Sequence, residues 1–143
     1  MTLDSNEQAQ TKQTIEFLSF AVNQFAAARD VNTLAAGLCE VIRRLMPVPI
    51  IGMFFIDPQT EALTLPIAIG LTEDEQREAL RTAHERHPGW VIRTGQSLHV
   101  PDVEADFERR TSNSPRTIAV RARLWMPVKI DDKAVGALGL ASP

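Results

Sequence analysis

The stretch HPGWVIRTGQSLHVPDV, residues 87–103, orders the elements in the second half of the chain. Pro88 and Gly89 are suited to open a short helix, and Gly95 lies where a left-handed residue would end it. Ser97–Val100 then has the length and composition of a short strand. The stretch therefore predicts a helix, a sharp stop and a strand in direct succession.

A second stretch, AVRARLWMPVKIDDKAVGALGLASP at residues 119–143, predicts two further strands. Arg121–Ile130 alternates apolar and polar residues, which is typical of a strand with one buried face. A polar turn, Asp-Asp-Lys, leads from it into Ala134–Ala141. In that last strand Gly136 and Gly139 leave room for another group to approach the backbone closely.

The N-terminal part of the chain carries the signals of two helices. Residues 1–10 are polar and are expected to be flexible. Thr11–Ala28 has apolar residues at helical spacing, namely Ile15, Leu18, Val22 and Phe25. Asp30 is suited to cap a second helix, because its carboxylate can accept from the free amides of the first turn. The apolar stripe of that helix consists of Leu34, Leu38, Val41, Ile42 and Leu45.

A predicted hairpin and a third helix follow. Ile50–Asp57 and Ala62–Ile69 are rich in strand-forming residues and are separated by a turn-like break. Pro66 lacks an N–H for a sheet ladder, so the second of these strands is expected at the edge of the sheet. Thr72 and Glu75 have the spacing of a capping box, which predicts the start of a helix.

This order of elements predicts an α+β fold with a single antiparallel sheet of five to six strands. We expect the N-terminal helices on one face of the sheet, and the short helices together with a loop over the other face. The loop is the segment Asp102–Arg116, which is rich in acids and arginines and is expected to order only when something binds. A sheet covered by such a loop is a natural place for a ligand cavity.

Length and composition limit the class of protein. The chain has 143 residues, 44% of them hydrophobic, which fits one globular domain with its own core. Its formal charge of −3 argues against a nucleic-acid surface, and it has no apolar run long enough for a membrane helix. The single cysteine, Cys39, cannot form an internal disulfide. With no secretory signal at the start, these features favour a cytoplasmic protein.

The two stretches quoted above resemble the second half of a GAF domain, the small-molecule sensing module of many signalling proteins. The resemblance rests on these residues: Gly89, Gly95-Gln96, Pro101-Asp102, Arg121-Ala122, Pro127-Val128, Gly136 and Ser142. It extends in element order over residues 11–143, which we take as the domain. Ala122 departs from the family's common serine, so a hydroxyl contact to a ligand is absent there.

The resemblance implies a role in signal transduction rather than catalysis. A GAF domain of this kind binds a small molecule between sheet and loop, and passes the signal through its terminal helices to an output domain. In a two-component system that output is a histidine kinase or similar. The amphipathic N-terminal helix is expected to keep apolar surface after packing, and a parallel homodimer through the N-terminal helices would cover it.

Specialised members of the family attach bilin through a cysteine or haem through a histidine, commonly before the penultimate strand. The corresponding segment here, Val103–Val120, contains neither residue type. Nothing in the sequence supports cyclic-nucleotide binding either. The cofactor, if the domain has one, is therefore left open by the sequence, as is the identity of the ligand.

The candidate ligand-binding residues are Trp90, Asp102, Phe107, Arg121, Arg123 and Met126. The aromatic candidates could equally belong to the plain core of the domain. For the charged candidates we favour salt pairing at the loop and the sheet edge over ligand contact. For Trp125 we favour packing at the surface or at an interface.

The remaining reactive side chains are better explained without a catalytic or metal site. His84 and His87 do not have the spacing of a zinc helix and are expected to be solvated residues at helix ends. His99 is expected to be exposed or in packing contact. Cys39 lies on an amphipathic helix and is expected to be a structural thiol.

Two other functions remain open. The first is a dimerisation module whose vestigial cavity is filled by side chains. The second is a redox enzyme similar to free methionine sulfoxide reductases. That family uses more than one cysteine, so Cys39 without a resolving partner argues against the second.

Overall fold

The structure is a computed structural model that describes residues 4–105 and 116–143. The chain forms two compact units, one ending at Pro47 and the other spanning Val48–Pro143. None of the described helices combines the length and the apolar character needed to cross a bilayer.

The first unit is a pair of helices, α1 (Ser5–Ala26) and α2 (Val31–Leu45). Asp30 caps α2 as predicted: its carboxylate accepts a hydrogen bond of 2.7 Å from the backbone N–H of Thr33. Gly37 lies against the backbone of α1, and a Cβ there would sit 3.3 Å from the carbonyl oxygen of Gln24. The helix α1 begins inside the segment that we predict to be flexible.

The second unit contains a five-stranded antiparallel sheet in the order β2-β1-β5-β4-β3. Its strands are β1 (Ile50–Ile56), β2 (Leu63–Ile69), β3 (Leu98–Val100), β4 (Ala122–Ile130) and β5 (Lys133–Ser142). The α+β fold with one antiparallel sheet is confirmed, and all five strands lie where the sequence predicts them. Coverage of one face by the N-terminal helices stays a prediction.

Proline residues lie at both borders of this sheet. Pro66 is in β2, which is an outer strand as its proline predicted. At the other border β3 pairs only with residues 123–125 of β4. Within the described residues, β4 therefore has no partner on that side at Pro127. The missing N–H of each proline is tolerated because neither position needs ladder bonds on both sides.

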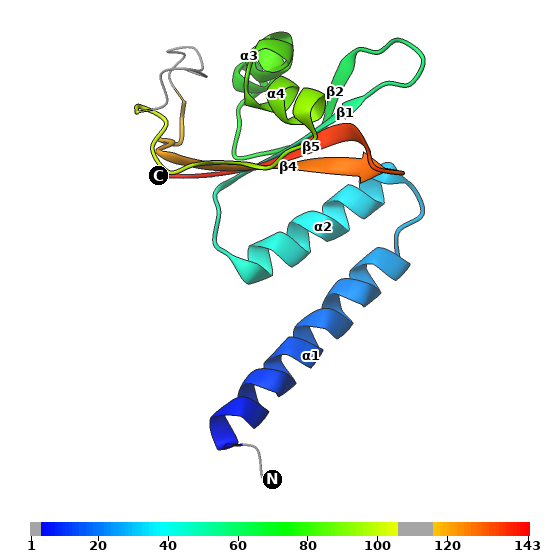
Figure 1. The fold of residues 1–143 in the computed structure, drawn as a ribbon, viewed down its shortest axis with the longest axis vertical. Coiled ribbons are helices and arrows are strands. Elements are labelled where there is room, and N and C mark those ends of the chain that lie inside the picture. The colour runs from blue at the N-terminus through cyan, green and yellow to red at the C-terminus, as the bar shows by residue number, and fades with distance from the viewer. Residues whose placement is uncertain (1–3, 106–115) are drawn as a thin grey trace. The chain divides into compact units, whose positions relative to one another are not determined.

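Three short helical segments lie over one face of the sheet: α3 (Glu73–Thr82), the 3-10 turn η1 (Ala83–Glu85) and α4 (His87–Thr94) (Figure 1). The predicted capping box opens α3, with Thr72 Oγ1 accepting from the N–H of Glu75. Gly95 ends α4 in the left-handed conformation with φ of 65°, as predicted.

The core of this unit lies between the helices and the sheet. Phe54 and Leu63 from the sheet pack with Ala79 and Ala83 from α3 and η1, and Trp125 borders this cluster. A second cluster joins α4, β3 and β5, and consists of Val91, Leu98, Val100 and Ala137. This packing fixes α3 and α4 over the sheet and so defines the space between them.

Candidate functional site

A cavity of about 70 Å³ lies between the sheet and the helices α3 and α4. It is large enough for a few water molecules or a small organic molecule. Its walls are mostly apolar and come from every layer of the second unit: Ile50 and Phe54 from β1, Leu65 from β2, Ala79 from α3 and Pro88 from α4.

The floor of the cavity is made by two glycines on neighbouring strands. Gly52 of β1 pairs with Gly139 of β5, and Gly139 pairs in turn with Trp125 of β4. All three residues line the cavity. A Cβ built on Gly52 would be 3.8 Å from the nearest atom, a ring carbon of Phe54, which is ordinary contact. The space over Gly52 is therefore open, whereas the space over Gly139 is occupied by the Trp125 ring.

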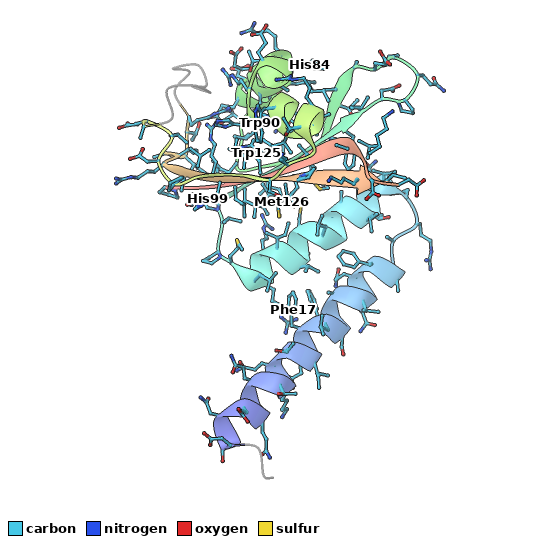
Figure 2. The ribbon with its side chains drawn as sticks, viewed as in Figure 1. Phe17, His84, Trp90, His99, Trp125 and Met126 are labelled. Atoms are coloured by element: carbon cyan, nitrogen blue, oxygen red, sulfur yellow. The ribbon has the colours of Figure 1, made fainter. Side chains whose placement is uncertain are left out.

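Trp125 forms one wall of the cavity, and our expectation that it packs at the surface is wrong. Its ring centroid is 5.9 Å from that of Phe54 and 6.5 Å from that of His87. The indole ring also lies over Gly139, where any Cβ would collide with it. In the described part of the chain, Nε1 of Trp125 is buried without a hydrogen-bond acceptor. Figure 2 shows Trp90 and Trp125 on the side of the sheet that carries α3 and α4.

Three arginines border the same cavity: Arg86 between η1 and α4, Arg116 at the end of the loop, and Arg123 on β4. Burial, with the nearby charges of Arg116 and Arg86, lowers the pKa of Arg123 to about 10. Burial also lowers the pKa of Arg86, with Arg116 as the next cause. The guanidinium of Arg123 lies 3.4 Å from Nδ1 of His87. The three arginines thus lie on one side of an otherwise apolar cavity.

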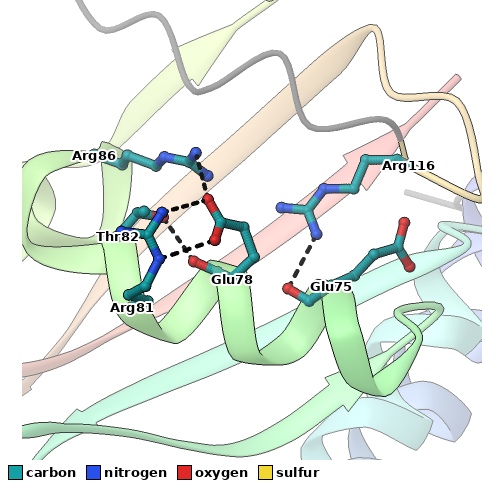
Figure 3. A network of polar contacts seen from close by, with 6 residues as sticks. All are labelled: Glu75, Glu78, Arg81, Thr82, Arg86 and Arg116. Carbon is teal, nitrogen blue, oxygen red and sulfur yellow. Dashed lines mark hydrogen bonds and ion pairs between the residues drawn. The ribbon is translucent and has the colours of Figure 1, made fainter.

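Two glutamates of α3 hold part of this arginine cluster (Figure 3). Glu78 accepts two hydrogen bonds from Arg81, of 3.0 and 2.8 Å, and lies 3.9 Å from Arg86. The carbonyl oxygen of Glu75 accepts a bond of 3.3 Å from Arg116. Arg116 is thereby placed at the cavity by the first turn of α3.

The carboxylate of Glu75 links α3 to the chain that follows the loop. It accepts hydrogen bonds of 2.7 Å from the N–H of Thr72 and 2.6 Å from the N–H of Thr117. Burial acts to raise the pKa of Glu75, but these bonds and the charge of Arg116 together hold it below the usual value. The capping box was predicted, whereas the bond to Thr117 has no local signal in the sequence.

Of the predicted ligand residues that the structure describes, Arg123 alone lines the cavity. Trp90 is half-buried and packs against the cluster around Val91. Met126 does not line the cavity, and Figure 2 shows it on the opposite face of the sheet. Phe107 lies outside the described residues. Ligand contact by any of these residues stays a prediction.

Asp102 and Arg121 join the two ends of the loop instead of lining the cavity. Their side chains are 3.6 Å apart, and Arg121 is 74% exposed. The N–H of Val103 donates a bond of 2.8 Å to the carbonyl of Arg121. This is the salt pairing that we favoured for these two residues from the sequence.

The predictions for the remaining reactive side chains are confirmed for three residues and wrong for one. His84 and His99 are exposed, as expected, but His87 is only 1% exposed, so its assignment as a solvated residue is wrong. Cys39 is a buried thiol as predicted, and burial raises its pKa. Among residues 4–105 and 116–143, no group of three or more His, Cys, Asp or Glu side chains could hold a metal ion.

The family model for the GAF domain matches residues 28–143. The chain belongs to the GAF domain family. The match covers the whole sheet, the helices over it and the cavity between them. The resemblance drawn from the two C-terminal stretches is therefore confirmed, and the protein is a regulatory module of the type found in signalling proteins.

Solved structures similar to this GAF domain include the GAF domain of a phosphoenolpyruvate-protein phosphotransferase from Acinetobacter. It is 13% identical with a TM-score of 0.73, and the match covers 91% of this chain and 77% of that one. A domain of a putative two-component sensor histidine kinase from Sinorhizobium meliloti 1021 is 16% identical with a TM-score of 0.63, covering 80% and 74%.

A third similar structure is the free methionine-R-sulfoxide reductase from Neisseria meningitidis in complex with its substrate. It is 17% identical with a TM-score of 0.67, and the match covers 99% of this chain and 78% of that one. At identities this low, the structural similarity establishes a common fold only. The ligand and the chemistry depend on the residues of this chain.

Proposed function

We propose that this GAF domain is a non-catalytic sensor that binds a small molecule in the cavity between the sheet and the helices α3 and α4. Binding would be passed through the terminal helices to an output domain, such as a histidine kinase. The observation that carries the proposal is the cavity itself. Its walls are mostly apolar, arginines lie on one side, and short helices and the end of the loop cover it.

The contacts of the loop suggest how binding would change the domain. Arg116, at the end of the loop, and Val120, which follows it, line the cavity. Thr117 lies between them and bonds to Glu75 of α3. A ligand that touches Arg116 thus acts on the end of the loop and on α3 together. It shifts the domain only if it binds two arrangements of these segments with different affinity.

Calorimetry of the full chain against a panel of metabolites, combined with hydrogen exchange, tests the sensor proposal. We expect at least one ligand to bind and to increase the exchange protection of the amides around residues 116–121 and the first turn of α3. A ligand that binds without changing exchange in these segments would argue against signalling through the loop.

Replacing Gly52 by valine tests whether the cavity is the binding site. The added side chain would occupy the open floor, because the atoms nearest to a Cβ there, on Phe54 and Leu65, are 3.8 and 3.9 Å away. We expect ligand affinity to fall roughly tenfold or more, while the free energy of unfolding changes by about 1 kcal/mol or less. Calorimetry and denaturant unfolding measure the two effects.

The matched control is Ala62→Val, which adds apolar volume at an exposed position before β2. It should change neither binding nor stability appreciably. Unchanged affinity in Gly52→Val would place the ligand elsewhere. If wild-type protein binds nothing from the panel and stays dimeric, the alternative of a dimerisation module with a vestigial cavity is favoured.

The state of Cys39 supports a non-catalytic domain over the redox alternative. Its thiol is 2% exposed and has a raised pKa, whereas a nucleophilic cysteine needs an accessible thiolate. Cys39 belongs to α2 and is not among the cavity-lining residues. Reduction of methionine sulfoxide that is lost in Cys39→Ser would overturn this part of the proposal.

We also propose that the domain forms a parallel homodimer through α1. Four large apolar side chains of α1 are exposed: Ile15 at 58%, Leu18 at 54%, Val22 at 62% and Phe25 at 39%. Their spacing of three, four and three residues is that of the a and d positions in a coiled coil. A second, parallel copy of the helix would cover this stripe and hold two copies of the domain together.

Replacing Leu18 by aspartate should convert this dimer to a monomer, because a charge would be buried at the centre of the stripe. The neighbouring change Ser19→Asp introduces the same residue beside the stripe and should leave the dimer intact. Light scattering after size-exclusion chromatography distinguishes the two states. A monomeric wild type at high concentration, or a dimeric Leu18→Asp variant, would contradict the proposal.

A further inference from the structure

Residues 116–121, which lead from the loop into β4, form a strap along the cavity. They belong to no helix or strand. Exposure alternates along the strap: residues 116, 118 and 120 are half-buried, and the residues that follow each of them are exposed. Arg116 and Val120 line the cavity. The strap is therefore an extended piece of chain with one side toward the cavity and the other toward solvent.

The strap is attached at its two ends. At the end next to β4, the N–H of Arg121 donates a bond of 2.8 Å to the carbonyl oxygen of Ser142 in β5. At the other end, Arg116 and Thr117 both bond to Glu75 of α3. In the part of the chain that the structure describes, the backbone of residues 118–120 makes no hydrogen bond between these ends. Segments with so few backbone bonds open at low cost in free energy.

Glu75 divides its carboxylate between the helix and the strap. Oε2 accepts from the N–H of Thr72 at 2.7 Å and caps α3, whereas Oε1 accepts from the N–H of Thr117 at 2.6 Å. Glu75 is only 8% exposed. Burial acts to raise its pKa, but these bonds and the charge of Arg116 hold the pKa below the usual value. The carboxylate is therefore ionised at neutral pH, and both of its bonds are charge-assisted.

We propose that the strap opens and closes one side of the cavity, with Arg121 as its hinge and Glu75 as the positioning residue that latches it. The proposal adds a route of entry to the sensor function and rests on that function. Loss of the bond to Thr117 leaves the cap of α3 in place, because the other oxygen of Glu75 makes it. The strap can thus open while the helix stays folded.

Most of the rest of the described wall is held more firmly than the strap. The strands β1 and β5 are paired along their length. Ala79 and Ala83 belong to the buried cluster that includes Phe54. Opening the cavity at these places would break the sheet or the core, whereas opening the strap breaks only its bonds to Glu75 and a small apolar contact. Among the described segments, the strap is the side that opens at the lowest cost.

A thiol placed inside the cavity measures this opening without any ligand. Ala83 is fully buried and lines the cavity, so Ala83→Cys puts a thiol there. The full chain with this change is treated with iodoacetamide, and peptide mass mapping follows the labelling rate of each thiol. Native Cys39 is the internal control, because it is buried and does not line the cavity. In this background both thiols should react far more slowly than a free thiol.

Three further changes in this background test the latch. Glu75→Gln removes the charge and leaves one acceptor oxygen for two N–H groups, so we expect the introduced thiol to react roughly tenfold faster or more. Thr117→Pro removes the same bond from the side of the strap, and gives the test if Glu75→Gln unfolds. Thr72→Ala is the matched control, because it removes the hydroxyl that caps α3 but leaves the bond to the strap. It should not accelerate labelling of the introduced thiol.

Hydrogen exchange tests the hinge. In Glu75→Gln the amide of Thr117 should exchange faster, while the amide of Arg121 keeps its protection through the bond to Ser142. Equal loss of protection at both amides would mean that the strap leaves the sheet altogether, which would overturn the hinge.

The labelling outcomes separate this inference from the sensor proposal. Parallel acceleration at Cys39 would show that the whole fold opens, and equal acceleration in Thr72→Ala would show that only the helix cap matters. Either result, or unchanged labelling in both Glu75→Gln and Thr117→Pro, overturns the latch. The sensor function is decided separately by the metabolite panel and by Gly52→Val, since no ligand takes part in the labelling.

Discussion

The Gly89→Ala variant is expected to lose about 3 kcal/mol or more of its free energy of unfolding. Gly89 lies in the first turn of α4, where the helix presses against the backbone of η1. A Cβ there would overlap the carbonyl group of His84 and would lie 2.8 Å from the carbonyl oxygen of Ala83. Because these are main-chain atoms, no side-chain rotation can relieve the collision, and α4 would have to move away from η1.

Chemical denaturation measured by circular dichroism gives this free energy. Gly95→Ala is the matched control, because Gly95 ends the same helix and the nearest atoms to its Cβ are 3.5 Å away on the side chain of Lys129. Its φ of 65° should cost alanine about 1 kcal/mol. If the two variants were equally stable, the close approach of α4 and η1 would be wrong.

The Gly139→Ala variant is expected to lose about 2 kcal/mol, because its Cβ would occupy the space of the Trp125 ring. The ideal Cβ lies 2.7 Å from Cε3 of the indole, and two other ring atoms are closer still. Phe54 and His87 flank that ring, so it cannot swing freely aside. The variant should also show an altered tryptophan emission spectrum, since the environment of the indole changes.

A double-mutant cycle isolates this contact. In a Trp125→Phe background the smaller ring leaves room for the added methyl, so Gly139→Ala should cost about 1 kcal/mol less than in the wild type. Gly52→Ala serves as the control on the paired strand, where the nearest atom to the Cβ is 3.8 Å away. Strictly additive effects of the two changes would mean that the ring does not rest on Gly139.

The sequence predicted the elements of this domain well because their signals are local. Asp30, Thr72 and Gly95 each occupy a helix end, and each acts there through atoms within a few residues. The edge position of Pro66 follows from its missing N–H alone. Such signals need no knowledge of what packs on the element.

The alternation of apolar and polar residues led to a wrong assignment of the two faces of β4. Alternation along the strand correctly separates Trp125 and Arg123 from Met126, but it does not say which face is covered. The charged neighbours suggested that Trp125 faces outward. The structure instead covers that face with α3 and α4, so Trp125 becomes a cavity wall and Arg123 a half-buried cation beside it. His87 was misjudged for the same reason, because its burial depends on the sheet beneath α4.

Arg86 and Arg116 were missed as site residues because nothing near them in the sequence marks them. Arg86 looks like one of several charges at a helix end, and Arg116 like part of a polar loop. Their convergence depends on the contact of Glu75 with residues 116 and 117, more than forty positions along the chain. Contacts at that separation come from the tertiary fold rather than from periodicity or capping.

The prolines at the two borders of the sheet also bear on how the protein avoids aggregation. An open sheet edge offers unpaired N–H and C=O groups on which a strand of another molecule can form. Pro66 interrupts the donors along β2, and Pro127 does so on the part of β4 that extends past β3. Growth of the sheet from molecule to molecule is disfavoured at both borders. Two copies of this domain can therefore be held at high local concentration without their sheets joining.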